Sequence, residues 1–216
     1  TVATITDNDL FIGTTTNGIL HYNLNNETLI NEIVLNGPIQ NNSFSVTAQN
    51  NEVWLVYGGY SVSGDPFPLN REGYSYFKDN QWVNTEYNDI IETLGVNDVT
   101  DLVAVSINPF NQNQMFISSF YSGLLEVNNG IPTKLFNNTN SNLESLGPFL
   151  SPPDPTYIDI RIGKSKFDNN GKLWLTNGRV NNAVKSYDIL NNNWEEFSLE
   201  NIIADPLNDE NLFSDI

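Results

Sequence analysis

The sequence predicts an all-β fold, a β-propeller built of four-stranded antiparallel blades. One observation behind this prediction is a short apolar triplet with a large central residue, which recurs along the chain. A second is that a polar turn precedes each triplet and strand-like runs rich in β-branched residues flank it. The central residues of the triplets are Phe11, Trp54, Phe116, Trp174 and Phe213. We expect these aromatic side chains to be buried between neighbouring sheets, because a four-stranded sheet cannot bury both of its faces alone.

Each repeat contains four strand-like runs in the same order. The first run precedes the polar turn, the triplet forms the second, the third begins at a glycine in three of four repeats, and the fourth follows another turn. The repeats predict four blades over about residues 1–36, 43–84, 102–136 and 160–198, and the start of a fifth over 202–216. Since a propeller closes only when its last blade pairs with its first, we expect a single propeller domain or a fragment of a larger one.

The composition narrows the classes of function. The 216 residues include 26 acidic and 9 basic side chains, which gives a net charge of −17. Such a surface repels phosphate backbones, so we expect no nucleic acid partner. No apolar run approaches the ~20 residues of a membrane-spanning helix, so we expect no transmembrane segment in this chain. The chain opens at Thr1 without a methionine, which suggests that it was cut from a longer precursor.

The sequence offers few residues for catalysis or metal binding. There is no cysteine, and His21 is the single histidine, on a run where a strand-surface role is expected. The turn at 168–171 is similar to the start of a calcium loop, but no late glutamate follows it. Glu195 and Glu196 point to opposite faces of a strand and cannot flank one glycosidic bond. We therefore expect no cofactor, no metal and no catalytic residue, although distant acids that converge in the fold leave a glycosidase or lyase open.

Loop length predicts which end of the strands is functional. The connections at one end are long, over residues 60–71, 84–101, 137–157 and 177–182, whereas the turns at the other end are short. Long loops without regular structure are often binding loops, so we expect ligands at the long-loop end. The candidate ligand-binding residues there are the aromatics Tyr57, Tyr60, Phe67, Tyr121 and Tyr157 and the cations Arg71, Arg161 and Arg179. The alternative is that the aromatics pin the loops to the rim and that the arginines pair with neighbouring acids.

Two segments carry motifs of a known repeat. The first joins Ser-Ile-Asn-Pro at 106–109 to residues 115–119, 122–127 and 140–143. The second, at 161–177, contains Phe-Asp-Asn-Asn-Gly-Lys-Leu-Trp-Leu-Thr-Asn. Both resemble blades of the PorZ-like propellers of type IX secretion systems. They are also similar to the broader two-component-regulator propeller repeat, which is shared by glycan-sensing periplasmic domains of hybrid histidine kinases.

The resemblance implies a non-catalytic protein of the bacterial outer-membrane surface or periplasm, which assists the attachment of a lipopolysaccharide anchor to secreted cargo. Its implied partners are other secretion-system or envelope proteins, with a glycan or lipopolysaccharide as a further candidate. No functional residue is carried over from the family. Two alternatives stay open: the extracytoplasmic glycan-sensing propeller of a hybrid two-component regulator, and a propeller enzyme that degrades polysaccharide.

Overall fold

The computed structural model describes residues 2–15, 18–34, 36–199 and 201–202. In this part of the chain the fold is all-β apart from short helices, and the strands form four antiparallel four-stranded sheets. The sheets confirm the predicted class of blade, whereas the number of blades in a closed propeller stays a prediction. The chain divides into two compact units, Thr1–Gly37 and Pro38–Ile216. Within the described ranges, no helix is long and apolar enough to cross a membrane.

Unit 1 is a single sheet in which each strand pairs with the next in the sequence. Its strands are β1 (Val2–Thr6), β2 (Asp9–Gly13), β3 (Ile19–Asn23) and β4 (Thr28–Ile33). His21 lies on one face, where its ring stacks on Phe11 with the centroids 4.3 Å apart. Its Nδ1 lies 3.0 Å from Asn31 Oδ1 and its Nε2 lies 3.1 Å from Asp9 Oδ1. The histidine therefore belongs to the polar surface of a strand.

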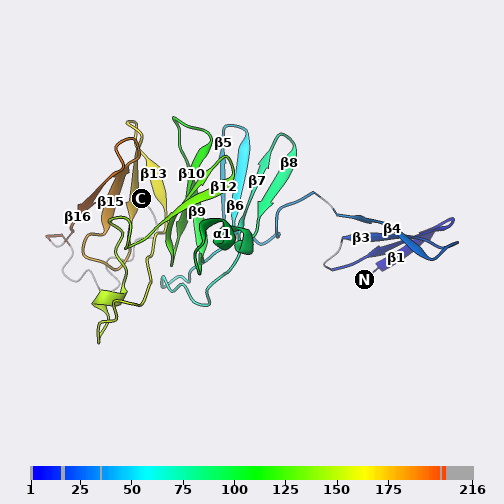
Figure 1. Cartoon of the computed structure of the whole chain (residues 1–216), viewed down its shortest axis with the longest axis horizontal. Helices are drawn as coiled ribbons and strands as arrows, with labels where there is room; N and C mark the ends of the chain where they lie inside the picture. The colour runs from blue at the N-terminus through cyan, green and yellow to red at the C-terminus, as the bar shows by residue number, and fades with distance from the viewer. Residues whose placement is uncertain (1, 16–17, 35, 200, 203–216) are drawn as a thin grey trace. The chain divides into compact units, whose positions relative to one another are not determined.

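Unit 2 contains three sheets that stand side by side in Figure 1. The first consists of β5 (Ser45–Gln49), β6 (Glu52–Val56), β7 (Tyr74–Lys78) and β8 (Gln81–Thr85). The second consists of β9 (Leu102–Ile107), β10 (Gln114–Ser119), β11 (Gly123–Asn128) and β12 (Ile131–Phe136). The third consists of β13 (Ser165–Phe167), β14 (Lys172–Thr176), β15 (Val184–Asp188) and β16 (Asn193–Phe197).

The first strands of the three sheets contact one another, as the inner strands of propeller blades do. Thr47 on β5 donates a hydrogen bond to the Val105 carbonyl on β9, with a donor–acceptor distance of 3.1 Å. Ser106 on β9 donates to the Ser165 carbonyl on β13, and the two hydroxyl oxygens lie 2.9 Å apart. Polar contacts thus join neighbouring sheets along their inner strands, while other strands of the sheets bury apolar side chains between them.

Two apolar layers lie between the three sheets. Trp54 is fully buried in the layer between the first and second sheets, with Met115 and Ile117 of β10. Phe116 is fully buried in the layer between the second and third sheets, with Leu173 of β14. Alternate residues of β10 therefore face opposite neighbours, since successive side chains of a strand point to opposite faces. The predicted burial of the central aromatics is confirmed at these two positions.

The predicted burial between neighbouring sheets is wrong for Phe11, which is half-buried in the single sheet of unit 1, and for Trp174, which is also only half-buried. Its neighbours Leu173 and Leu175 fill the layer against the second sheet, so Trp174 points to the opposite face of its own sheet. There its ring stacks on Phe197 at a centroid distance of 5.5 Å, and its Nε1 donates to Asp168 Oδ2 at 3.0 Å. Phe213 and the expected fifth blade, apart from its first residue, lie outside the described residues.

The sequence predicted an irregular loop over 84–101. This prediction is wrong, because the connection contains helix α1 (Tyr87–Leu94). Asp89 accepts a hydrogen bond from the Glu86 backbone at 3.2 Å, which caps the first turn. Gly95 ends the helix in the left-handed region with φ of 64°. Ile90 is fully buried in the layer between the first and second sheets. The helix therefore closes that layer beside β12. A short 3₁₀ helix, η1 (Gly147–Phe149), lies in the connection between β12 and β13.

Candidate functional site

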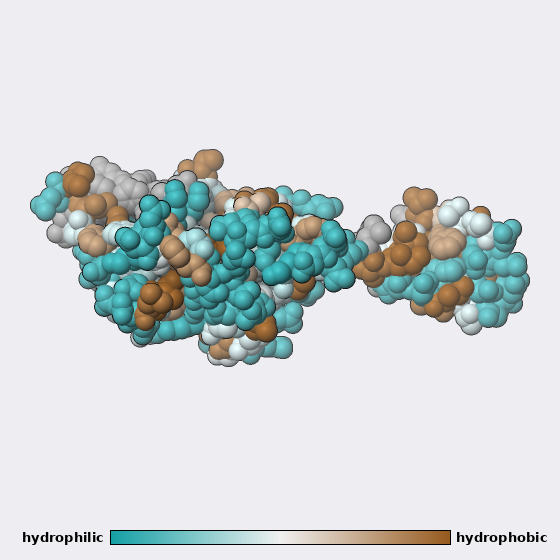
Figure 2. Space-filling view, turned by 90° about the horizontal axis from the view of Figure 1, so that it is seen from above, coloured by the Kyte–Doolittle hydropathy of each residue, from teal (hydrophilic) through white to brown (hydrophobic). Residues whose placement is uncertain are grey.

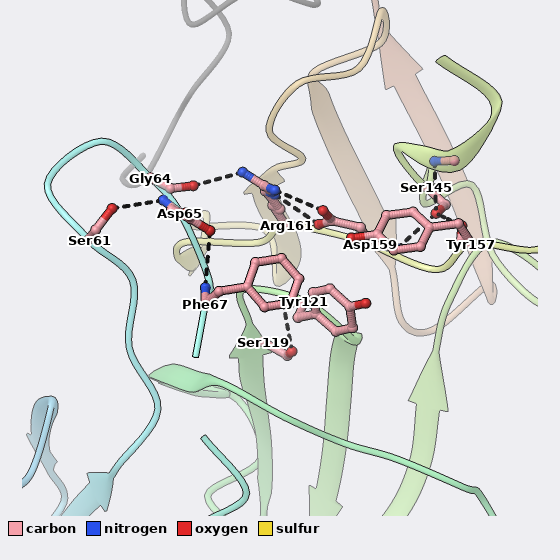
Figure 3. A network of polar contacts seen from close by, with 11 residues as sticks. Ser61, Gly64, Asp65, Phe67, Ser119, Tyr121, Ser145, Tyr157, Asp159 and Arg161 are labelled. Carbon is pink, nitrogen blue, oxygen red and sulfur yellow. Dashed lines mark hydrogen bonds and ion pairs between the residues drawn. The ribbon is translucent and has the colours of Figure 1, made fainter. Parts of the chain in front are cut away.

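In unit 2 the long connections all lie at one end of the strands, which we call the long-loop end. The short turns lie at the other end, which we call the short-turn end. The long-loop end carries residues 57–73, 86–101, 120–122, 137–164 and 177–183. Figure 1 shows these connections below the strands and the short turns above them. The contacts that link the long connections to one another, shown in Figure 3, are centred on Arg161.

Arg161 is buried, and all three nitrogens of its guanidinium donate hydrogen bonds within the protein. Its Nε and Nη2 each donate to a carboxylate oxygen of Asp159 at 2.8 Å, and its Nη1 donates to the Gly64 carbonyl at 2.7 Å. Asp159 is buried as well. The guanidinium also lies over the ring of Phe120, 6.0 Å from its centroid. The pair therefore ties the connection after β6 to the connection before β13, and the positive charge is neutralised inside the fold.

Five aromatic side chains gather beside this ion pair, and we call them the aromatic cluster: Tyr60, Phe67, Phe120, Tyr121 and Tyr157. Tyr60 stacks on buried Phe120, with ring centroids 4.2 Å apart. Tyr121 packs edge-to-face against Phe67 at 5.9 Å and against Tyr157 at 6.4 Å. Phe67 is 52% exposed. The cluster thus presents aromatic surface to solvent from three different connections.

Local hydrogen bonds hold the cluster in place. The Ser61 hydroxyl accepts from the Asp65 backbone at 3.0 Å, and Asp65 Oδ1 accepts from the Phe67 backbone at 3.1 Å. The Ser119 hydroxyl accepts from the Tyr121 backbone at 3.1 Å. Figure 3 shows the rings of Phe67 and Tyr121 next to each other, with the Ser61–Asp65 contact above them and Ser119 below. The loop backbone is fixed by its own side chains, which lowers the ordering cost of binding.

The structure brings Tyr60, Phe67, Tyr121, Tyr157 and Arg161 together, but it gives Tyr57 and Arg71 other contacts. Tyr57 is 4% exposed and its hydroxyl donates to Ser75 Oγ at 2.6 Å, so it offers no stacking surface. Arg71 lies on the surface and its Nη2 contacts Asp98 Oδ2 at 2.9 Å. Arg179, half-buried with φ of 60°, follows Gly178, whose backbone N–H donates to the Arg161 carbonyl at 2.8 Å.

Phe120 and Asp159 belong to this arrangement although the sequence did not single them out. The spacing of Asp159 and Arg161 was a usable signal, because residues two apart on extended backbone point to the same side. Phe120 gave no such signal, since its contact with Tyr60 joins connections that are far apart in the sequence.

Asp101 is a buried carboxylate beside the 60–71 connection. Its Oδ1 accepts from the Asn70 backbone at 3.1 Å and from the Asn70 side chain at 2.9 Å. Its Oδ2 has no hydrogen-bond partner in the described part of the chain. Burial raises the pKa of Asp101 to about 6, against the opposing effect of the hydrogen bonds from Asn70. The carboxylate anchors the end of the 60–71 connection, and its free oxygen can take up a proton without breaking that anchor.

We therefore expect Asp101 to make stability depend on pH. Because the pKa is higher in the folded protein than in the unfolded chain, protonation favours the folded state, and this group adds stability as the pH falls from about 6 towards 4. Asp101→Asn should remove that dependence and raise the free energy of unfolding at pH above 7 by about 3 kcal/mol. Urea unfolding of both proteins across this pH range measures the difference. A difference that stays constant with pH would contradict the assignment.

This chain is similar to known proteins in its fold. A scan against protein-family models and a search of curated proteins find no match. Among solved structures, PorZ of Porphyromonas gingivalis, described as an essential bacterial surface component of the type IX secretion system, is similar with a TM-score of 0.71 and 18% identity. The similarity covers 91% of this chain and 25% of the PorZ chain. This chain therefore spans about a quarter of the length of the protein that it matches.

Two extracellular domains from B. thetaiotaomicron are more distant. BT3049, assigned to a hybrid two-component system, matches with a TM-score of 0.44 and 12% identity over 88% of this chain and 22% of its own. BT4673, assigned to a one-component system, matches with a TM-score of 0.46 and 14% identity over 95% of this chain and 23% of its own. The likeness that carries weight is the one to PorZ, and it concerns the fold. Within the described residues, the chain shares its fold with the part of PorZ that it matches.

Proposed function

We propose that this chain is part of a non-catalytic β-propeller of an exported bacterial surface protein, which binds other envelope proteins through the long-loop end of unit 2. The observation that carries the proposal is the aromatic cluster around partly exposed Phe67, held by the buried pair of Arg161 and Asp159. The PorZ fold supports a place in secretion, where PorZ itself is described as a surface component. Assistance in attaching a lipopolysaccharide anchor to cargo is part of the proposal.

The surface chemistry of the long-loop end suits a protein partner. Partly exposed aromatic rings at the centre of a fixed surface are typical binding hot spots, because they bury much apolar area at a small cost in side-chain entropy. Val62 and Ile158 add exposed apolar side chains on the connections that carry Phe67 and Tyr157. Both ends of the Arg161–Asp159 pair are buried, so the pair holds the surface in shape without lending it a charge.

The charge of the chain argues against direct recognition of an anionic glycolipid at this end. The net charge is −17, and the cation nearest the aromatic cluster, Arg161, is already neutralised by Asp159. A lipopolysaccharide anchor would meet a repulsive field here. Contact with the proteins that carry or process such an anchor avoids that repulsion, which is why we propose a protein partner.

Affinity capture tests this function. The chain, immobilised and exposed to detergent-solubilised envelope of the cell that produces it, should retain envelope proteins, and Phe67→Ala should reduce that retention about tenfold because it removes the most exposed ring of the cluster. Ile131→Ala is the matched control, since Ile131 is also exposed but begins β12 at the short-turn end.

Equal retention by the wild-type protein and Phe67→Ala would contradict the proposal. Recovery of an oligosaccharide without any protein would instead favour a glycan-sensing propeller. Turnover of a polysaccharide substrate by the purified chain would favour the enzyme alternative.

A further inference from the structure

The short-turn end of unit 2 contains a cleft between the second and third sheets. It has a volume of about 490 Å³ and is formed by the turn between β9 and β10, the turn between β13 and β14, and the turn between β15 and β16. Seen from above in Figure 2, the surface is mostly hydrophilic, and apolar residues gather in small separate patches. The cleft lies at the opposite end of the strands from the aromatic cluster, so it is a second surface and does not depend on the function proposed above.

An exposed aromatic ring and an exposed aliphatic side chain line this cleft. Phe110 is 65% exposed although it sits in a fixed turn, where its backbone N–H donates to Asn108 Oδ1 at 2.9 Å. The ring covers Gly171, since a Cβ at that position would lie 3.2 Å from Phe110 Cδ2. Leu190, on the far side of the cleft, is 94% exposed. The ring is thus supported from one side by a glycine and leaves much of its surface in solvent.

Polar side chains that are mostly neutral amides surround the ring. Asn111, Asn170 and Asn191 line the cleft together with the carboxylate of Asp188. Asp188 is held in place because its Oδ2 accepts from Asn191 Nδ2 at 2.8 Å and its Oδ1 accepts from the Asn191 backbone at 3.2 Å. The cation that lines the cleft, Lys172, contacts Glu195 Oε2 at 2.5 Å. The cleft therefore offers hydrogen-bond donors and acceptors, while its positive charge is already paired.

We propose that this cleft binds a neutral oligosaccharide, with a sugar ring against Phe110 and its hydroxyl groups hydrogen-bonded to Asn170 and Asp188. The apolar face of a pyranose packs on an aromatic ring, while side-chain amides and carboxylates exchange hydrogen bonds with its hydroxyls. The volume lies within the range of small-ligand sites, roughly 300–1,000 Å³. The acidic chain disfavours an anionic sugar, and an apolar peptide would leave the surrounding amides without partners.

An NMR titration of the isotope-labelled full chain with neutral oligosaccharides tests the proposal. Four are used: α-1,4-linked glucose, β-1,3-linked glucose, xylose and mannose oligomers. At least one should saturate below about 10 mM and shift the amide signals of Phe110, Gly171 and Leu190. Phe110→Ala should weaken that binding about tenfold and Asn170→Ala about threefold, whereas Ile131→Ala, exposed at the same end of the second sheet, should leave the affinity unchanged.

Absence of binding by all four sugars at about 10 mM would overturn the proposal. So would a titration whose shifts lie outside the cleft, or an affinity unaffected by Phe110→Ala. Loss of envelope-protein capture in Phe67→Ala concerns the other end of the strands, so the two tests fail independently.

Discussion

Phe116→Ala is expected to lower the free energy of unfolding of unit 2 by about 3–5 kcal/mol. Phe116 is fully buried between the second and third sheets, where it lies 6.4 Å from Phe136 and 6.3 Å from Tyr187, measured between ring centroids. Its removal leaves a cavity in a layer that two rigid sheets cannot close. Urea unfolding followed by tryptophan fluorescence measures the loss.

The control is Phe110→Ala, which removes the same side chain from a position that is 65% exposed. Its expected cost is within about 0.5 kcal/mol, as for most surface substitutions. A loss at Phe116 no larger than that at Phe110 would show that the sheets are not packed face to face through the central residues of their second strands.

Arg161→Ala is expected to cost about 3–5 kcal/mol, because it leaves the buried Asp159 carboxylate without its partner. The substitution also frees the Gly64 carbonyl, so the connection that carries Phe67 loses its anchor. The double variant Arg161→Ala/Asp159→Ala should recover part of the loss, since no unpaired charge then remains buried. Thermal unfolding of the single and double variants measures both effects.

The chain offers a matched arginine for comparison. The side chain of Arg161 is 7% exposed and that of Asp159 is 1%, whereas Arg71 and Asp98 form a pair that is 53% and 35% exposed. Arg71→Ala should therefore cost much less stability than Arg161→Ala. Equal costs at the two arginines, or a double variant no more stable than Arg161→Ala, would refute the structural role of the buried pair.

Local patterns in the sequence were sufficient to predict the strands. The run at 102–107 and the triplet around Phe116 correspond to β9 and β10, because β-branched residues and a polar turn are local signals for a hairpin. The end of the strands at which Tyr60, Phe67, Tyr121 and Tyr157 gather could also be predicted. Antiparallel order alone places alternate connections at the same end.

Contacts between distant segments could not be predicted. The bond from Arg161 to the Gly64 carbonyl joins residues 97 positions apart, and no periodicity reports such a contact. Helix α1 was missed because it is only 8 residues long and contains two adjacent isoleucines, Ile90 and Ile91, which favour strands. The cleft beside Phe110 was missed for a related reason, since it forms where short turns of two different sheets meet.

Photocross-linking from position 67 is the most direct test of the proposal that the long-loop end binds envelope proteins. A photoreactive phenylalanine analogue at Phe67, in the chain expressed in its own cell, should form adducts with envelope proteins, whereas the same analogue at Ile131 should form few, because the two positions lie at opposite ends of the strands. Adducts from position 67 that exceed those from position 131 about tenfold are the predicted result. Adducts of equal yield from both positions, or adducts from position 131 alone, would contradict it.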